Sequence, residues 1–304
     1  MDDELIINYD APVSDVPMIQ WFPGHMAKTR RLMQENLKYV DIVVELTDAR
    51  IPLSSRNPEI DKIVGDKPRI ILLNKSDSAD KSVTAQWLRF YKERGIPALA
   101  VDCKNGAGLN QFLPAVYQAL KEVIAKRKAK GMTAKLSMMV VGVPNVGKSS
   151  FINRMAKSRR AKVEDRPGVT RGKQWVKIDD NLDLLDMPGV LWPKFEDRTA
   201  GENLAFTGAV KDDILDMAML AIRLLMILQK EYPEMLKDRY KLTEDITKLS
   251  PYALLELIGK KRGMLISGGE IDIERAAIML LDEFRSGKIG RISLERPARG
   301  GTDE

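Results

Sequence analysis

The stretch Gly142-Val143-Pro144-Asn145-Val146-Gly147-Lys148-Ser149 decides the fold. It follows an apolar run at 136–141, which predicts a buried strand, and it precedes a segment that predicts a helix beginning at Ser149. In that context the Gly-x-x-x-x-Gly-Lys-Ser pattern predicts a loop whose backbone N–H groups surround the phosphates of a nucleotide. A chance match to the pattern is the alternative, and the flanking strand and helix argue against it.

The side chains at the end of this loop have chemical roles in phosphate binding. Lys148 would place a positive charge on the β- and γ-phosphates, and the Ser149 hydroxyl would ligate Mg²⁺. The N-terminus of the following helix adds the positive end of its dipole. The residues predicted to contact the nucleotide here are Asn145, Val146, Gly147, Lys148, Ser149 and Ser150.

A second pattern, Asn74-Lys75-Ser76-Asp77, follows a predicted strand at 69–73. Asp77 can accept hydrogen bonds from the N1–H and 2-amino groups of guanine, whereas adenine would leave this carboxylate unpaired at a cost of ~1–3 kcal/mol. Asn74 would brace the loop, and the stem of Lys75 would pack along the base. Alone, the pattern fits a polar turn equally well. Together with the phosphate loop it predicts a guanine-recognition loop and GTP as the ligand.

The order of these two patterns is reversed relative to an ordinary GTP-binding domain, in which the phosphate loop comes first. The reversal predicts a circularly permuted P-loop domain. Apolar runs alternate with helical stretches, which predicts an α/β fold with a mostly parallel sheet and helices on both faces. The predicted strands are 42–46, 69–73, 98–101 and 136–141, and the predicted helices are 26–39, 83–94 and 109–130.

Beyond about residue 200 the chain shows helical periodicity only, which predicts an all-α C-terminal domain. Two strand candidates, 174–178 and 182–185, precede it and predict a hairpin. The predicted helices of the C-terminal part are 213–231, 251–259 and 272–284. The expected divisions are an acidic tail at 1–17, a permuted nucleotide-binding domain at 18–198 and a helical domain at 199–304.

Three further stretches fit the remaining loops of a GTP site. Asp186-Met187-Pro188-Gly189 would place Asp186 near Mg²⁺ and the Gly189 N–H near the γ-phosphate, as a switch II segment. Thr170 is the switch I candidate for contact with Mg²⁺ and the γ-phosphate. Asp102-Cys103-Lys104 follows a predicted strand where GTPases usually carry Ser-Ala-Lys against the base. The Asp and the Cys depart from that pattern, so the loop is placed at the base without assigned contacts.

These five motifs, in their permuted order, resemble those of the circularly permuted GTPases. Two more stretches, Trp21-Phe22-Pro23-Gly24-His25-Met26 and Asp48-Ala49-Arg50-Ile51-Pro52, resemble the bacterial ribosome biogenesis GTPase A (YlqF-like) family. The resemblance covers the chain from about residue 18. It implies a role in late assembly of the large ribosomal subunit, and it implies that the helical domain binds ribosomal RNA.

The group that orients the attacking water is open to interpretation. Ras-type GTPases place a Gln directly after Asp-x-x-Gly, but Val190 occupies that position here and can form no side-chain hydrogen bond. His25, the single histidine, would enter beside switch II in a permuted domain and orient water as a neutral imidazole. The alternatives are that His25 caps or packs the helix beginning at Met26, or that it binds RNA.

Asn145 has two interpretations of equal weight. Some GTPases use an Asn at this place to help hold a K⁺ beside the nucleotide, where the cation supplies charge that an arginine finger otherwise gives. Alternatively, Asn145 only satisfies its neighbours in the loop. The expected cofactors are therefore GTP and Mg²⁺, with K⁺ as an open addition.

Composition restricts the setting of the protein. The 304 residues carry a net charge of +6, which favours a polyanionic partner only weakly. The single Cys103 excludes an internal disulfide. An acidic N-terminus and an apolar run at 217–228 that is interrupted by Arg223 predict neither a secretory signal nor a membrane span. We expect a cytoplasmic monomer.

Basic residues gather at 158–162, 166–173, 260–262 and 285–291. A solvated basic surface is the ordinary explanation of such runs, and only the last two are favoured as RNA contacts, mostly by resemblance. The function expected is that of a GTP hydrolase whose nucleotide state gates docking on a precursor of the large ribosomal subunit. The first alternative is a GTP-dependent RNA-binding placeholder whose hydrolysis only triggers release. The second is an ATPase or kinase, which requires the guanine loop to be coincidental.

Overall fold

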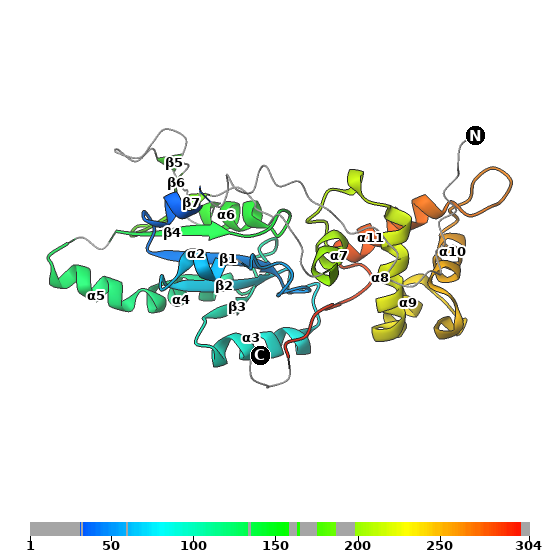
Figure 1. Cartoon of the computed structure of the whole chain (residues 1–304), viewed down its shortest axis with the longest axis horizontal. Coiled ribbons are helices and arrows are strands. Elements are labelled where there is room, and N and C mark those ends of the chain that lie inside the picture. Colours follow the sequence, from blue (N-terminus) through cyan, green and yellow to red (C-terminus); the bar gives the residue numbers. More distant parts are fainter. Residues whose placement is uncertain are drawn as a thin grey trace. The chain divides into compact units, whose positions relative to one another are not determined.

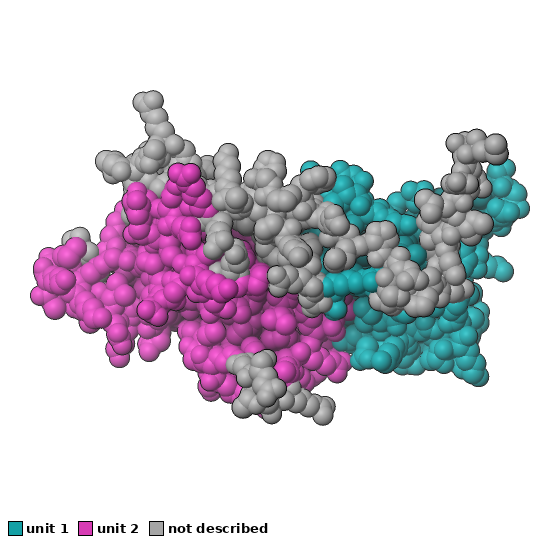
Figure 2. All heavy atoms as spheres, viewed as in Figure 1, with its two compact units in different colours: residues 1–20, 196–292 teal, residues 21–195, 293–304 magenta. Residues whose placement is uncertain are grey.

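The computed structural model describes residues 31, 33–58, 60–132, 135–157, 163–164, 175–186 and 198–298. They fall into two compact units, shown in two colours in Figure 2. One unit holds the described residues up to 186 together with 293–298, and the other holds 198–292. The last described residues thus belong with the first part of the chain, although the sequence placed them in a helical region at 199–304.

The first unit is built on a mixed sheet (Figure 1). Among the described residues it has seven strands in the order β3-β2-β1-β4-β7-β6-β5. The five strands from β3 to β7 in this order run parallel, whereas β6 is antiparallel to β7 and β5 is antiparallel to β6. The strands are β1 (Ile42–Asp48), β2 (Arg69–Asn74), β3 (Ala98–Ala100), β4 (Leu136–Val141), β5 (Val163–Glu164), β6 (Trp175–Asp179) and β7 (Leu182–Asp186).

Both faces of the sheet are buried, as the near-continuous apolar runs of β1, β2 and β4 predict. On one face Val43 and Met139 are register partners and pack with a helical turn at 33–37 and with α2 (Ile60–Val64). Farther along this face, α3 (Lys81–Glu93) adds its own aromatic side chains to the core. The alternate residues of the same strands are equally buried, for example Val44, Leu46, Leu72 and Val140. The prediction of an α/β fold with covered sheet faces is confirmed.

The connecting helices differ from the predicted ones in three places. The helix predicted over 109–130 is interrupted at Leu120 and forms α4 (Phe112–Ala119) and α5 (Lys121–Ala129). α4 buries Phe112 and Val116, whereas α5 buries no side chain, so only the first part is held by the core. α2 was not predicted, because five residues are too few to show helical periodicity. α6 (Lys148–Lys157) begins one residue before its predicted start.

The second unit is helical and has its own core. Its helices are α7 (Arg198–Phe206), α8 (Met217–Glu231), α9 (Pro233–Tyr240), α10 (Pro251–Lys261) and α11 (Ile273–Arg285). α8, α10 and α11 contact one another through buried Leu, Ile and Phe side chains. α8 begins at Met217 rather than at the predicted 213, because the Asp216 side chain accepts a hydrogen bond from the Met219 N–H and caps the helix there. None of the described helices is long and apolar enough to cross a membrane.

Candidate nucleotide-binding site

The candidate site lies where the parallel strands end. Parallel strands present their carboxyl ends at one edge of a sheet, and ligands of open α/β sheets bind outside that edge. In spatial order, the ends of β3, β2, β1, β4 and β7 carry the predicted base-backing loop, the guanine loop, the Asp48-Ala49-Arg50 stretch, the phosphate loop and Asp186. Motifs that are far apart and reversed in the sequence therefore line one edge, with a single strand between the guanine and phosphate loops.

Close backbone packing explains the two glycines of the phosphate loop. A Cβ on Gly142 would lie 2.6 Å from the carbonyl oxygen of Leu46 on the neighbouring strand β1. Gly147 has a φ of +103°, and a Cβ there would overlap the side-chain amide of Asn74. Asn145 also has a positive φ of 57°. The loop thus turns tightly against both the end of β1 and the guanine loop.

Lys148 lies across this loop. Its Nζ donates hydrogen bonds to the carbonyl oxygens of Gly142 and Val143, each at 3.0 Å. Burial lowers the pKa of Lys148 to about 8, while the charge of Asp186 at the end of β7 opposes that shift. Ser149 and Ser150 are exposed in the first turn of α6. A phosphate chain over the loop would therefore meet the ammonium, the helix N-terminus and the two hydroxyls together.

Asn74 joins three of the loops. Its Nδ2 donates to the carbonyl oxygen of Val146 in the phosphate loop at 2.7 Å, and its Oδ1 accepts from the N–H of Cys103 at 2.9 Å. The side chain is buried. The bracing role expected of Asn74 therefore extends beyond its own loop, since one amide fixes the guanine loop to the phosphate loop and to the base-backing loop.

The other residues of the guanine loop are more accessible. Lys75 adopts a positive φ of 59°, and its Nζ lies 3.0 Å from Oδ2 of Asp48. Asp77 is exposed, and its Oδ2 accepts a hydrogen bond from the Ser78 hydroxyl at 3.2 Å. The carboxylate predicted to recognise guanine thus lies at the solvent-facing side of a loop whose preceding residues are anchored.

The base-backing loop uses its two unusual residues for its own structure. The buried Asp102 carboxylate accepts hydrogen bonds from the N–H groups of Lys104 and Asn105 at 2.9 and 3.0 Å. Burial, reinforced by Asp102, raises the pKa of the Cys103 thiol to about 12, so the thiol is neutral at physiological pH. Lys104 is exposed, and its carbonyl oxygen accepts a hydrogen bond from Arg154 of α6. This link by Arg154 was not predicted from the sequence.

A second feature that sequence reasoning missed is a buried ion cluster around Asp48. Both carboxylate oxygens accept from the Arg50 guanidinium, at 2.9 Å from Nε and 2.8 Å from Nη2, and Lys75 is the third member. Asp48 and Arg50 are 2% and 1% exposed. Burial alone would raise the pKa of Asp48, but Arg50 and Lys75 hold it well below its usual range. The sequence contains Asp48-Ala49-Arg50, which indicated a family resemblance but did not predict a buried ion pair.

Several predicted residues lie outside the described part of the chain. These are His25, Thr170, Gly189 and Val190, the stretch 21–26, the tail 1–17 and the basic runs at 158–162 and 166–173. In the described ranges no group of three or more His, Cys, Asp or Glu side chains is arranged to hold a metal ion. The predicted Mg²⁺ set of Ser149, Thr170 and Asp186 needs no such group, since Mg²⁺ at nucleotide sites takes few protein ligands plus phosphate oxygens.

Comparisons with known proteins agree with this arrangement. Residues 137–254 match a family model described as a 50S ribosome-binding GTPase. This match begins at β4 and so excludes the guanine loop, as expected for a permuted order. A protein of Bacillus licheniformis named ribosome biogenesis GTPase A is 52% identical over 92% of this chain and 99% of its own length. The mitochondrial ribosome-associated GTPase 1 of Mus musculus is 33% identical over 94% of this chain and 92% of its own.

Solved structures add the architecture. A GDP-bound YlqF superposes with a TM-score of 0.61 at 26% identity, covering 88% of this chain and all of that one. A GNP-bound YlqF from T. maritima gives a TM-score of 0.59 at 26% identity, over 89% and 99% of the two chains. With the permuted loop order at one sheet edge and a relative at half identity over nearly the full length, the chain belongs to the ribosome biogenesis GTPase A family and its sheet unit is a circularly permuted GTPase domain.

Proposed function

We propose that this GTPase acts in late maturation of the large ribosomal subunit, and that its nucleotide state gates docking on a precursor of that subunit and release from it. The names of its relatives supply the ribosomal setting. The observation that supports the nucleotide site is the double hydrogen bond of Asn74 to the phosphate loop and the base-backing loop. That side chain would hold the groups that recognise the base and the phosphates at a fixed separation.

We assign the individual residues the roles that their motifs predict. Asp77 would pair with the N1–H and 2-amino groups of guanine, and Lys148 would exchange its two carbonyl partners for phosphate oxygens, which are stronger, charged acceptors. Ser149, Thr170 and Asp186 would hold Mg²⁺, which neutralises charge that develops on the phosphates. The positive φ of Lys75 (59°) and of Asn145 (57°) supports these roles, because uncommon backbone conformations of non-glycine residues cluster at functional sites.

Hydrolysis also needs a group that orients water, and we assign this role to His25 because Val190 cannot perform it. His25→Ala should slow single-turnover hydrolysis on the ribosomal subunit without changing GTP affinity. Unchanged turnover would contradict the assignment. For Asn145, a faster rate in KCl than in NaCl at matched ionic strength would support K⁺ as a further cofactor, and equal rates would exclude it.

The helical unit would supply the RNA contact. In the two favoured basic runs, Lys260, Lys261, Lys288 and Arg291 are exposed. Arg285, by contrast, donates to the Asp212 carboxylate at 2.7 Å and to the carbonyl oxygen of Phe206, so it stabilises its own unit. RNA binding should therefore depend on the exposed group and weaken as salt rises. We also expect the protein to act as a monomer in the cytoplasm.

The direct test is GTP turnover measured with and without purified large-subunit precursors. The proposal predicts faster turnover with precursors, and it predicts that precursor affinity differs between GTP, GDP and a non-hydrolysable analogue. Equal turnover in both conditions would overturn the assembly role. A large difference in affinity between nucleotides with little stimulation of turnover would favour the placeholder function instead.

A further inference from the structure

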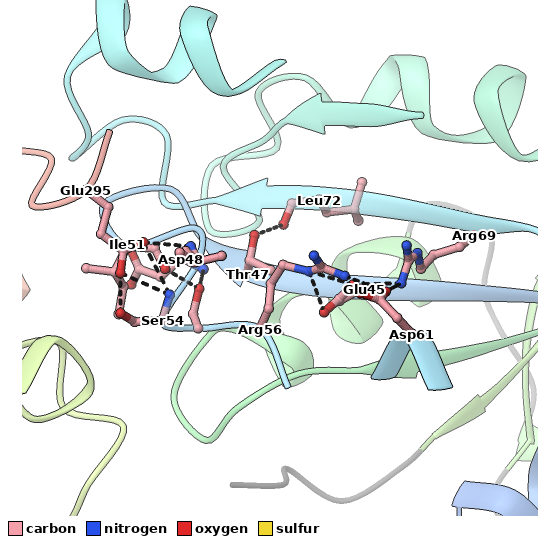
Figure 3. Close-up of polar contacts among 12 residues, drawn as sticks. Glu45, Thr47, Asp48, Ile51, Ser54, Arg56, Asp61, Arg69, Leu72 and Glu295 are labelled. Carbon is pink, nitrogen blue, oxygen red and sulfur yellow. Dashed lines mark hydrogen bonds and ion pairs between the residues drawn. The ribbon is translucent and has the colours of Figure 1, made fainter. Parts of the chain in front are cut away.

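The turn that follows β1 contacts both the guanine loop and residues 293–298. Figure 3 shows this turn, with Asp48 at the strand end, Ile51 and Ser54 in the turn and Glu295 above it. The turn is internally bonded, because the Ser55 hydroxyl accepts from the Asp48 N–H at 2.9 Å and donates to the carbonyl oxygen of Ile51 at 2.6 Å. It is therefore a fixed platform rather than a loose connection.

One side of this platform holds the guanine loop. Asp48 and Asn74 are register partners in the sheet, and the Ala49 N–H donates to the carbonyl oxygen of Asn74 at 2.7 Å. The Asp48 carboxylate then reaches across to the Lys75 ammonium at 3.0 Å. Lys75 has a left-handed backbone conformation that non-glycine residues rarely adopt. Partners on both sides of the peptide thus fix the direction in which the chain leaves β2 toward Asp77.

The other side of the platform is held by residues 293–298, which we call the C-terminal strap. The Leu294 N–H donates to the carbonyl oxygen of Arg50 at 2.8 Å. The Glu295 carboxylate accepts from the N–H groups of Leu53 and Ser54, at 2.6 and 3.0 Å, and from the Ser54 hydroxyl. The strap therefore fixes the backbone of the residue whose guanidinium clamps Asp48.

Contacts with α3 fix the strap itself. The Trp87 Nε1–H donates to the carbonyl oxygen of Glu295 at 3.2 Å, and the Asp80 N–H donates to the hydroxyl of the buried Ser293 at 3.1 Å. Asp80 caps α3, which begins just after the guanine loop. The strap follows directly in the chain on Ile292, the last residue of the helical unit. A chain of bonded groups thus runs from the strap through Arg50 and Asp48 to Lys75.

We propose that Asp48 is a positioning residue for guanine recognition, which sets the place of Asp77 by holding Lys75, and that the C-terminal strap supports it through Arg50. This rests on the proposed role of Asp77 in reading the base. The Asp48 carboxylate is held by Arg50 and Lys75, and Asp77 lies two residues beyond Lys75 in the same loop. Asp48 would therefore act on guanine recognition through the loop. The phosphate loop is held separately by Asn74 and is expected to keep its affinity for phosphates.

The test compares the binding of GDP with that of IDP, whose hypoxanthine base lacks the 2-amino group that Asp77 would bind. Because a charged hydrogen bond is at stake, the unchanged protein should prefer GDP on the order of 10- to 100-fold. In Asp48→Asn the preference should fall to about threefold or less, through weaker GDP binding with little change in IDP binding. A purely structural role would instead weaken GDP and IDP equally and leave their ratio unchanged.

Two matched variants separate the possible outcomes. Asp77→Ala should abolish the GDP preference; if it does not, the proposed recognition of guanine by this loop fails. If Asp77→Ala abolishes the preference and Asp48→Asn retains it, the inference about Asp48 is overturned while the proposed function stands. Asp183→Asn is the control, because Asp183 is also a buried carboxylate, paired with Lys135 at 3.1 Å near the other end of its strand. It should leave the ratio unchanged.

A second pair of variants keeps the proposal testable if Asp48→Asn does not fold. Lys75→Met removes the ammonium but keeps an apolar stem for the base, and the Asp48–Arg50 pair remains. It should lower the GDP preference nearly as far as Asp48→Asn. Glu295→Gln weakens the strap and should lower the preference by a smaller factor, about two- to fivefold. An unchanged GDP preference in Lys75→Met would contradict the proposal, and an unchanged preference in Glu295→Gln would remove the strap from it.

Discussion

Two buried carboxylates, Glu45 and Asp48, lie three residues apart on β1, and their surroundings shift their pKa values in opposite directions. Both are 2% exposed. Glu45, in the middle of the strand, accepts from the Arg56 Nε at 3.1 and 3.2 Å, and Arg69 lies farther away at 3.9 Å. Burial prevails there and raises the pKa of Glu45. At the strand end, Arg50 and Lys75 overcome the same burial and lower the pKa of Asp48.

The two clusters connect different parts of the domain. The Glu45 cluster joins β1 to its neighbour strand and, through Asp61, to α2, so it packs one face of the sheet (Figure 3). The Asp48 cluster joins the two loops that follow β1 and β2, at the sheet edge where we propose that the nucleotide binds. Both cations around Asp48 come from those loops, and one oxygen also accepts the Arg50 N–H at 3.1 Å. We infer that ion pairing at the strand end maintains loop geometry, whereas ion pairing within the strand joins β1 to β2 and α2 and offsets only part of the cost of burying Glu45.

The largest expected effect is on stability. Asp48→Asn leaves the buried Arg50 guanidinium without an anion and should lower the free energy of unfolding by about 3–5 kcal/mol. Glu45→Gln should change it by about 1 kcal/mol or less, because Asp61 still faces both Arg56 and Arg69. Urea unfolding with GDP absent measures both. Equal losses in the two variants would show that the clusters do not differ in the way described.

A similarly large effect is expected on the reactivity of Cys103, which belongs to the strand-end network through Asn74. Its pKa of about 12, raised from 9.0, leaves about a thousandth of the ordinary thiolate fraction at pH 8. Alkylation by iodoacetamide should therefore be about a thousandfold slower in the folded protein than in urea. Asn74→Ala should speed it by releasing the loop. Fast alkylation of the unchanged protein would contradict a closed base-backing loop.

The smallest effect distinguishes the two carboxylates by pH. A raised pKa means that the contribution of Glu45 is fully present below its ordinary pKa of 4.5 and is lost as the pH rises through the raised value. The stability of the unchanged protein relative to Glu45→Gln should thus decline as the pH rises above 4.5. The contribution of Asp48 has the opposite sign, since it is lost only as the pH falls below the ordinary pKa of 3.8. A relative stability that rises with pH above 4.5 would contradict the assignment for Glu45.

The sequence was informative wherever chemistry required particular residues at fixed spacing. The phosphate and guanine loops, the buried strands before them and the permuted order could all be predicted, because glycine conformations and apolar runs leave local patterns. The pairing of Asp48 with Lys75 could not, since it depends on β1 and β2 being neighbours in register. The contacts of Glu295 join residues about 240 positions apart, and no local pattern marks them.

The structure explains one departure from the usual GTPase pattern, in the base-backing loop. Asp102 and Cys103 differ from the usual Ser-Ala, and the structure shows why this is tolerated, since the carboxylate caps its own turn and the small thiol is buried. Short helices such as α2, and the break between α4 and α5, depend on which side chains the core accepts. Periodicity in a single sequence does not contain that information.

The most direct test of the central claim, that the strand-end loops form a guanine site read by Asp77, is nucleotide binding by Asp77→Asn. An amide at this position would still accept from the base N1–H, but its NH₂ would face the 2-amino group of guanine and match the 2-oxo group of xanthine instead. Binding of GDP and of xanthosine diphosphate should be measured for both proteins. In the variant, GDP binding should weaken by about tenfold or more and xanthosine diphosphate should become the better ligand. Unchanged GDP binding with no gain for xanthosine diphosphate would contradict it.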